Sequence, residues 1–312
     1  MLWRGISLTP SQIIHDMQRL TLRTLLLLVT ATSLCLWSCS SDDDDMDPAT
    51  INVNANTPDQ GEVARRLEIP HLKGGVVNMF LVKRVVGYGI NFCIEWDIVK
   101  KAQRWTAFRW DTSYHDDNIG RTEAWSEDFD IPIFYRTNRE EFYSGSGYTR
   151  GHMIASEDRQ QRPRALNEQT FLYSNMQPQL YDFNGGIWLQ LEKKVRTWNN
   201  DAFRDTLYVV KGGTIDHSSD IIETTRTGLL VPKYFFMAIL CKNKSTTNGG
   251  YKAIGFYLEH RSFYEDEKNL KPYIVSIDRL EELTGIDFFC NLPDIFEKQA
   301  EATVTPTAWG FQ

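Results

Sequence analysis

Residues 184–198 read NGGIWLQLEKKVRTW and carry the clearest helical pattern in the chain. Apolar side chains recur there three or four positions apart, which predicts one buried stripe on a helix over residues 186–198. These apolar positions are Ile187, Leu191, Val195 and Trp198. Asn184 stands before two glycines, and Asn is a favoured N-cap residue, so the helix is expected to begin just after it.

This helix also predicts a metal site. Glu192 and Arg196 are four residues apart and are therefore neighbours on one helix face. Asn184 lies ~12 Å from Glu192 along the helix axis, and the Glu192 side chain leans back toward it. An amide oxygen and a carboxylate that share a water molecule suit Mg²⁺, with Mn²⁺ as the alternative, because Mg²⁺ prefers oxygen ligands and keeps several waters.

Upstream of the helix, Arg150-Gly151-His152 adds the groups that phosphodiester hydrolysis needs. Histidine has a suitable ordinary pKa for a general base at neutral pH. Arg150 and Arg196 offer bidentate contacts to phosphate oxygens. A hydrated cation can stabilise the charged phosphorane and supply a proton to the leaving oxygen. Taken alone, each motif is weak, and their joint occurrence carries the prediction.

Three stretches resemble one family. They are YTRGHM at 148–153, FLYSNMQPQ at 171–179 and NGGIWLQLE at 184–192. The first is similar to the Asp-Arg-Gly-His motif of the DNA/RNA non-specific endonucleases, and the others follow in matching order and spacing. The resemblance covers roughly residues 76–292. It implies the ββα-metal nuclease fold, a strand pair with His152 against the helix that carries Asn184, and DNA and RNA as substrates.

The resemblance also implies a role for each matching residue. His152 corresponds to the general base, and Asn184 to the sole direct protein ligand of the metal. Glu192 corresponds to the acid that holds metal-bound water, and Arg196 to an arginine that stabilises the transition state. Arg150 is placed with these catalytic residues. The expected substrate-binding residues are Arg109, Asn175 and Gln177.

One position departs from the family motif. The leading Asp is Thr149 in this chain, and threonine can form hydrogen bonds but brings no charge. We therefore expect an altered metal preference and not a loss of activity.

The rest of the pattern indicates an α+β fold with a mostly antiparallel central sheet and flanking helices. β-branched and aromatic runs predict strands, and polar residues 111–150 predict long loops. The expected strands are 80–86, 91–99, 105–110, 207–210, 234–240 and 251–258. Residues 276–284 predict a short helix with Ser276 as N-cap and Gly285 as its stop.

The N-terminal residues indicate export. Three arginines precede the apolar run 25–36, which is shorter than the ~20 residues of a membrane span and is typical of a signal peptide over residues 1–38. Leu36-Trp37-Ser38-Cys39 resembles a bacterial lipobox, so a lipid on Cys39 would anchor the protein in the outer membrane of the cell envelope, where it could be exposed at the cell surface. A plain cleaved signal peptide or a membrane anchor is the alternative. An acidic, flexible tether is expected over 39–70, followed by one nuclease domain over 71–312.

Charge and cysteine content narrow the class of protein. The formal net charge is −7, which is not typical of a nucleic-acid-binding protein, but arginines cluster over 150–164, so binding is expected to be local and not spread over a broad basic surface. Beyond residue 39, Cys93, Cys241 and Cys290 remain, an odd number without metal-ligand spacing, which predicts buried thiols.

Two alternatives to the nuclease function stay open: a surface nucleic-acid-binding lipoprotein with weakened catalysis, and a phosphodiesterase for smaller substrates. The sequence does not define the oligomeric state.

Overall fold

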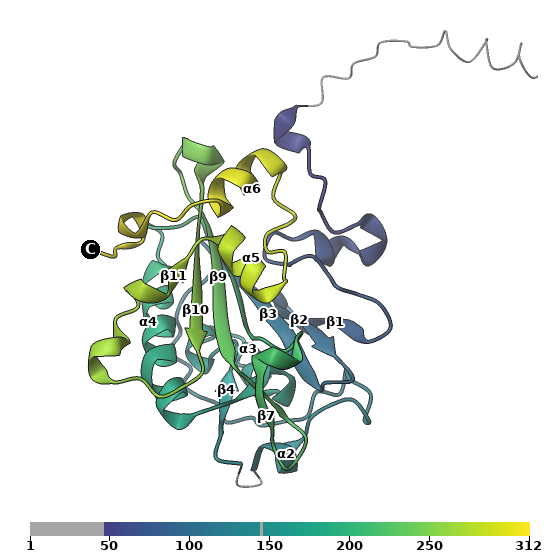
Figure 1. The fold of residues 1–312 in the computed structure, drawn as a ribbon. Helices are drawn as coiled ribbons and strands as arrows, with labels where there is room; N and C mark the ends of the chain where they lie inside the picture. The colour runs from purple at the N-terminus through teal and green to yellow at the C-terminus, as the bar shows by residue number, and fades with distance from the viewer. Residues whose placement is uncertain (1–46, 144–145) are drawn as a thin grey trace, which may run out of the picture. The chain divides into compact units, whose positions relative to one another are not determined.

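The computed structural model describes residues 47–143 and 146–312. In this part of the chain a seven-stranded sheet is antiparallel at every pair of neighbouring strands. In spatial order the strands are β1 (Asn78–Val85), β2 (Gly89–Asp97), β3 (Ala102–Asp111), β6 (Thr206–Gly213), β9 (Tyr234–Lys242), β10 (Tyr251–Glu259) and β11 (Ile274–Val275) (Figure 1). The predicted α+β class with an antiparallel central sheet is confirmed.

Two smaller antiparallel pairs accompany the sheet: β4 (Thr149–His152) with β5 (Met176–Gln179), and β7 (Ile221–Thr224) with β8 (Leu230–Pro232). The α-helices are α2 (Arg139–Tyr143), α3 (Ala165–Glu168), α4 (Leu189–Trp198), α5 (Ile277–Thr284) and α6 (Asp294–Glu301). A π-helical turn, Phe183–Trp188, leads directly into α4.

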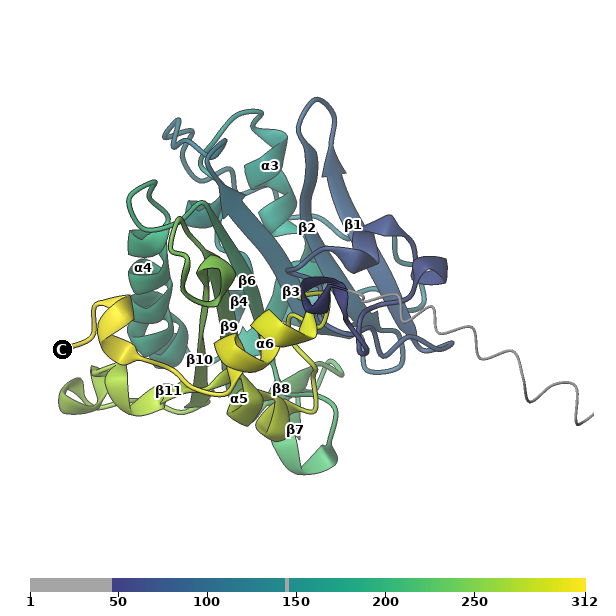
Figure 2. The ribbon, with the colours of Figure 1, turned by 90° about the horizontal axis from the view of Figure 1, so that it is seen from above.

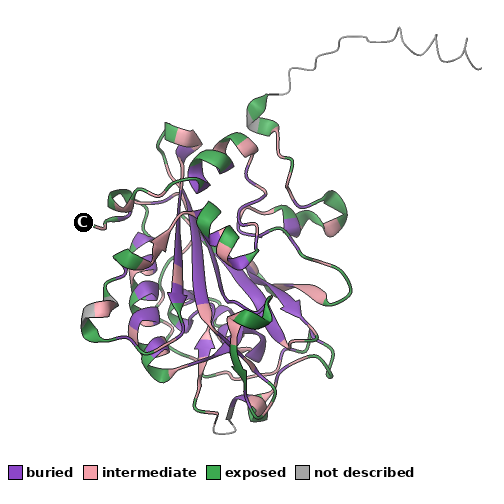
Figure 3. Ribbon diagram, viewed as in Figure 1, coloured by how far each residue is buried: buried purple, intermediate pink, exposed green. Residues whose placement is uncertain are grey.

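Apolar side chains cover both faces of the sheet. Leu191 and Trp198 of α4 belong to the core on one face, and Ile277 and Leu280 of α5 belong to the core on the other. Figure 2 shows α4 and the α5–α6 pair on opposite sides of the strands. Because side chains alternate between the faces and both faces are buried, residues 235–241 are all buried (Figure 3). This explains why strands of this chain read as continuous apolar runs.

Local signals located the regular elements well. Each of the six predicted strand segments falls on a strand of the central sheet. The helix expected at 276–284 is α5, where Ser276 Oγ accepts a hydrogen bond from the Arg279 N–H at 3.2 Å. Gly285 ends α5 with φ 67°, a left-handed conformation that glycine adopts without steric cost. Residues 112–143 and 146–150 are mainly loop, as expected, apart from α2 and the start of β4.

The N-terminal boundary differs from the expectation. The compact unit that the structure describes begins at Asp47, and residues 51–70 pack on it. Asn56 is buried, donates to the carbonyls of Ala64 and Pro70 and accepts from the Leu72 N–H at 2.8, 3.0 and 2.9 Å. The tether expected over 39–70 is therefore wrong for 51–70, because buried polar side chains anchor a segment that has few large apolar ones.

The signal peptide predicted over residues 1–38, Cys39 and the acidic run lie outside the described residues. Among residues 47–143 and 146–312, no helix has the length and apolar character that crossing a membrane requires. Cys93, Cys241 and Cys290 are buried free thiols, as the sequence predicted.

Candidate active site

A two-stranded ribbon places His152. β4 pairs with β5 so that His152 lies opposite Met176 and Thr149 lies opposite Gln179. The Thr149 hydroxyl donates to the Gln179 carbonyl at 2.9 Å and accepts from the Asn184 amide at 3.1 Å. The strand pair is thus bonded directly to the turn that carries Asn184, which is the arrangement implied by the ββα-metal fold.

Gly151 allows this ribbon to pack closely. A Cβ atom at position 151 would lie 2.3 Å from the Cδ atom of the fully buried Gln179 side chain. No side chain fits at that separation, so a larger residue would push β4 away from its support. Close packing against Gln179 therefore explains why glycine occupies the middle position of the Arg-Gly-His motif.

Aromatic rings enclose the His152 imidazole. Its centroid lies 5.5 Å from that of Trp125 and 5.2 Å from that of Phe171, both edge to face. Burial and then the positive charge of Arg121 lower the pKa of His152 to about 3, although a hydrogen bond to the Arg150 backbone acts in the opposite direction. The ring is therefore neutral near pH 7.

The Nε2 atom of His152 is buried and has no hydrogen-bond partner within the described part of the chain. Because Nε2 is unpartnered, the bond to the Arg150 backbone must come from Nδ1, which then carries the proton. Nε2 is left with a lone pair. A buried polar atom in this condition is costly and points to a ligand or water that completes it.

Asn184 is held inside a turn and does not cap the helix. The π-helical turn Phe183–Trp188 already contains it, and its backbone N–H donates to the Leu180 carbonyl at 2.9 Å. The predicted N-cap role is therefore wrong. Since the Asn184 side-chain NH₂ donates to Thr149, the amide oxygen remains as an acceptor.

A buried histidine fixes the strand end before this turn. His260 Nε2 accepts from the Leu180 N–H at 2.8 Å, while Nδ1 lies 2.9 Å from the Pro232 carbonyl oxygen. Burial lowers the pKa of His260 to about 4. The neutral ring, with one donor and one acceptor nitrogen, matches both partners, so His260 is structural.

Glu192 belongs to a buried network of four charged groups. Lys211 Nζ lies 3.2 Å from Glu192 Oε1 and 3.0 Å from Asp158 Oδ2, and Arg196 Nη1 lies 2.8 Å from Asp158 Oδ1. Burial raises the pKa of Glu192 above its ordinary value against the attraction of Lys211. Burial also opposes ionisation of Asp158, but Lys211 and Arg196 together lower its pKa. Asp158 therefore holds the negative charge of the network more firmly than Glu192.

A cleft of about 270 Å³ gathers four of the eight predicted site residues. The predicted residues that line it are Arg150, His152, Asn184 and Glu192, together with Thr149. Arg121 also lines it. The Arg150 guanidinium lies 3.6 Å from the centroid of the Trp125 ring, a cation–π contact that holds it at the rim. Arg196 is not among the residues that line this cleft. It is linked to Glu192 through Asp158 and Lys211.

Three predicted substrate-binding residues lie elsewhere. Arg109 is exposed on β3 and lines a different cleft, of about 360 Å³. The Asn175 side chain is fully buried and bonds to both backbone groups of Ile154 and to the Thr170 carbonyl. Gln177 is buried and donates to the Gln103 carbonyl. The expected substrate contacts are corrected accordingly: the Asn175 amide group is used entirely in backbone hydrogen bonds, and the Gln177 NH₂ group is used in one, while the Gln177 Oε1 atom is buried without a partner among the described residues.

Three site residues were missed from the sequence. Lys211 is the lysine within the apolar strand TLYVVKGG at 206–213, and a charge inside such a strand indicates a buried ion pair. Asp158 ends a single 3-10 turn, Ser156–Asp158, and Arg121 lies in a loop, and the sequence carried no signal at either position. Arg121 was absent from the arginine cluster because it lies 29 positions before Arg150 in the chain.

Comparison with known proteins identifies the family. A sequence model of the DNA/RNA non-specific endonucleases matches residues 86–295. The chain belongs to this family. The mitochondrial nuclease EXOG of Xenopus laevis is 28% identical over 214 residues, covering 65% of this chain and 58% of the relative. A nuclease of Nostoc sp. is 28% identical over 218 residues, covering 68% of this chain and 76% of the relative. The chain thus spans little more than half of the frog protein.

A solved structure shows the same fold for this endonuclease-family chain. The complex of EndoG with EndoGI aligns with a TM-score of 0.56 at 20% identity, covering 70% of this chain and 90% of that one. The fold of the chain is therefore the ββα-metal nuclease fold that the resemblance implied.

Proposed function

We propose that this member of the family is an endonuclease that hydrolyses phosphodiester bonds of DNA and RNA, with His152 as general base and a divalent cation, Mg²⁺, as cofactor. The observation that carries the proposal is the lone Nε2 atom of His152, buried without a partner beside the cleft that Asn184 and Glu192 also line. A neutral imidazole with one bonded and one free nitrogen is suited to accept a proton.

In the reaction, His152 Nε2 takes a proton from a water molecule whose oxygen attacks phosphorus. The new phosphorus–oxygen bond forms as the bond to the leaving oxygen breaks. The bound phosphate carries negative charge and raises the pKa of His152 in the complex, which makes the imidazole a stronger base than in the free protein. Arg150 and Arg121, on the same cleft, neutralise phosphate charge.

The residues present fit a hydrated Mg²⁺. The Asn184 amide oxygen is free of the Thr149 bond, and Lys211 takes only one oxygen of Glu192. With the Asn184 amide oxygen as the one direct ligand and the Glu192 carboxylate to hold a metal-bound water, most positions are left to water, which is how Mg²⁺ is commonly bound. When bound, the cation supplies positive charge to the phosphorane and a polarised water for the leaving group.

A cleavage assay tests the proposal. Purified protein should cut supercoiled plasmid and single-stranded RNA with Mg²⁺, and EDTA should abolish both activities because the cation site is stripped. A gel shift without cutting in any divalent metal would support the alternative of a weakened nucleic-acid-binding lipoprotein. Cleavage of a small phosphodiester alone would support the third function, a phosphodiesterase for smaller substrates.

Thr149 provides a test of metal preference. Thr149→Asp places a carboxylate next to Asn184, so we expect the Mg²⁺ concentration for half-maximal activity to fall by about tenfold, as partners of metal ligands commonly change affinity. Thr149→Ser keeps the hydroxyl and is the matched control, with unchanged metal dependence. Identical Mg²⁺ and Mn²⁺ titrations for Thr149→Asp and the wild type would show that this position does not influence the metal.

We further propose that residues 1–38 direct export and that a lipid on Cys39 anchors the protein in the outer membrane. The apolar run after three arginines and the lipobox-like residues before Cys39 support this. Cells given radioactive palmitate should label the wild type and not Cys39→Ala. Label retained by Cys39→Ala would refute acylation at this residue.

A further inference from the structure

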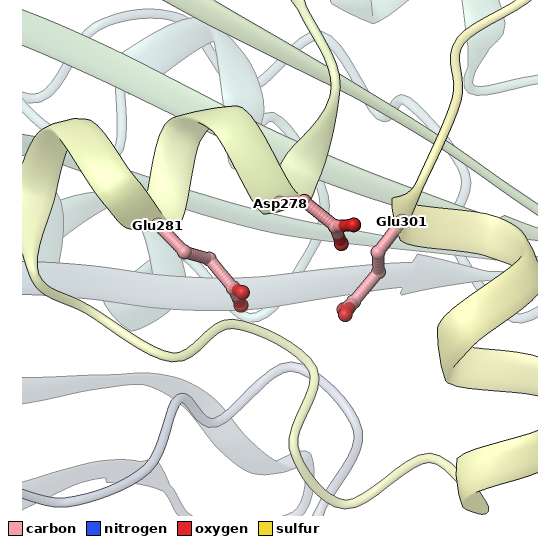
Figure 4. Close-up of side chains that lie close together, drawn as sticks. All are labelled: Asp278, Glu281 and Glu301. Atoms are coloured by element: carbon pink, nitrogen blue, oxygen red, sulfur yellow. The ribbon is translucent and has the colours of Figure 1, made fainter.

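Three carboxylates meet where α5 and α6 approach one another. Asp278 and Glu281 lie three residues apart on α5, and Glu301 is the last residue of α6. Figure 4 shows the three side chains reaching toward a common space. One ligand oxygen of each lies within 4.8 Å of the others. This carboxylate cluster (Asp278, Glu281, Glu301) contributes nothing to the cleft around His152.

Glu301 is the unusual member of the cluster. It is only 5% exposed, and its Oε1 atom is buried without a hydrogen-bond partner among the described residues. Glu281 differs, because its Oε1 accepts from the Phe288 N–H at 2.7 Å. A nearly enclosed carboxylate oxygen that faces two other carboxylates lacks the partner that buried charges require.

The surroundings do not supply that partner. Glu297 and Asp287 lie close enough to add negative charge, and both accept from the Asn54 amide. Burial and then neighbouring carboxylates raise the pKa of Glu301 to about 11, and burial raises that of Glu281 to about 8. Without a cation the cluster therefore takes up protons at neutral pH.

We propose that a Ca²⁺ ion binds between Asp278, Glu281 and Glu301 and joins α5 to the end of α6. Ca²⁺–oxygen bonds are ~2.4 Å long, so ligand atoms on one ion lie up to about 4.8 Å apart, which the cluster satisfies. Ca²⁺ accepts irregular shells of carboxylates and water, whereas Mg²⁺ demands a near-octahedral one. Asp278 is exposed, which leaves an entry path and room for water ligands.

The bound ion would stabilise the face of the sheet opposite α4. Residues 51–56 also reach this region, since Asn54 bonds to Asp287 and Glu297. Binding to the folded state alone raises the unfolding temperature by mass action. The site is structural and separate from the proposed cofactor site, so the two cations can be tested independently.

The test measures thermal unfolding in EGTA and in ~1 mM Ca²⁺. Asn184→Ala is used as the background, because this substitution removes the cation ligand in the cleft. We expect Ca²⁺ to raise the unfolding temperature by about 5 °C in the wild type and in Asn184→Ala. Adding Glu281→Gln and Glu301→Gln to Asn184→Ala should abolish the rise, while stability in EGTA stays equal or increases because repelling carboxylates are gone.

Glu282→Gln is the matched control, since Glu282 is an exposed carboxylate on α5 that pairs with Arg279. It should keep the full Ca²⁺ response. Isothermal titration of Ca²⁺ into Asn184→Ala should give one site and should give none after the two glutamine substitutions. An unfolding temperature that does not respond to Ca²⁺ in Asn184→Ala, or a response that survives both substitutions, would overturn the proposal and leave protons as the species that neutralise the cluster.

Discussion

His152→Ala is expected to lower kcat for plasmid cleavage by about 10³-fold, within the range that a general base contributes. The alanine removes the imidazole of His152, whose Nε2 atom is unpartnered among the described residues, while Arg121 and Arg150 remain on the cleft to bind phosphate. Nucleic-acid binding, measured by gel shift in Ca²⁺ or without metal, should therefore be retained. The effect lies on the chemical step and not on affinity.

The pH dependence gives a second readout for the same residue. The free protein keeps His152 neutral well below pH 6.5, because its pKa is lowered to about 3. The acid limb of the wild-type pH profile of kcat/KM should therefore contain no inflection near pH 6.5 that belongs to His152. The His152→Ala substitution should accordingly remove no inflection at that pH. His217→Ala is the matched control, because His217 is exposed and lines another pocket, and its activity should be unchanged. Wild-type cleavage rates in His152→Ala would rule out this residue as the base.

Lys211→Met is expected to lower the free energy of unfolding by about 3–5 kcal/mol, the usual cost of leaving buried charges unpaired. Lys211 is 1% exposed and is the cation between Asp158 and Glu192. Methionine has a similar length, so the change removes charge more than volume. Two carboxylates would then face one another in the interior, and one of them would take up a proton. Urea unfolding measures the loss.

Activity should fall with stability in Lys211→Met, because Glu192 would no longer be held at the cleft. Lys193→Met removes a lysine from the exposed side of α4 and is the matched control, with a change within about 0.5 kcal/mol. A Lys211→Met protein as stable as Lys193→Met would show that the buried network contributes little. In that case Glu192 would be positioned by the helix alone.

The predictability of the fold depends on how local each signal is. The capped helix at 277–284 was found because Ser276 and Gly285 act within one turn of its ends. The strands were found because apolar runs persist where both sheet faces are buried. The short strand β5 at 176–179 was not found from its pattern, since Met-Gln-Pro-Gln is neither alternating nor β-branched. Only pairing with β4 makes it a strand.

The sequence likewise predicted where some residues of the candidate site lie and not where others lie. His152, Asn184 and Glu192 line one cleft as predicted, because their motifs sit on adjoining elements. Asn175 and Gln177 share those motifs, yet both side chains are buried, because the whole segment 175–179 is buried and both side chains donate hydrogen bonds to backbone carbonyls. The motifs therefore predicted which segments lie near the cleft, but not which side chains of those segments line it.

The sequence alone determined the family, the antiparallel α+β class, and the base and metal-ligand candidates, since these depend on local pattern and on residue order. Tertiary structure alone decided that Lys211 and Asp158 support Glu192, that Arg121 and not Arg109 borders the cleft, and that residues 51–70 belong to the compact unit. These contacts join residues from 19 to more than 200 positions apart. The physical reason is that buried charges and amides select partners by distance in space, which no local spacing encodes.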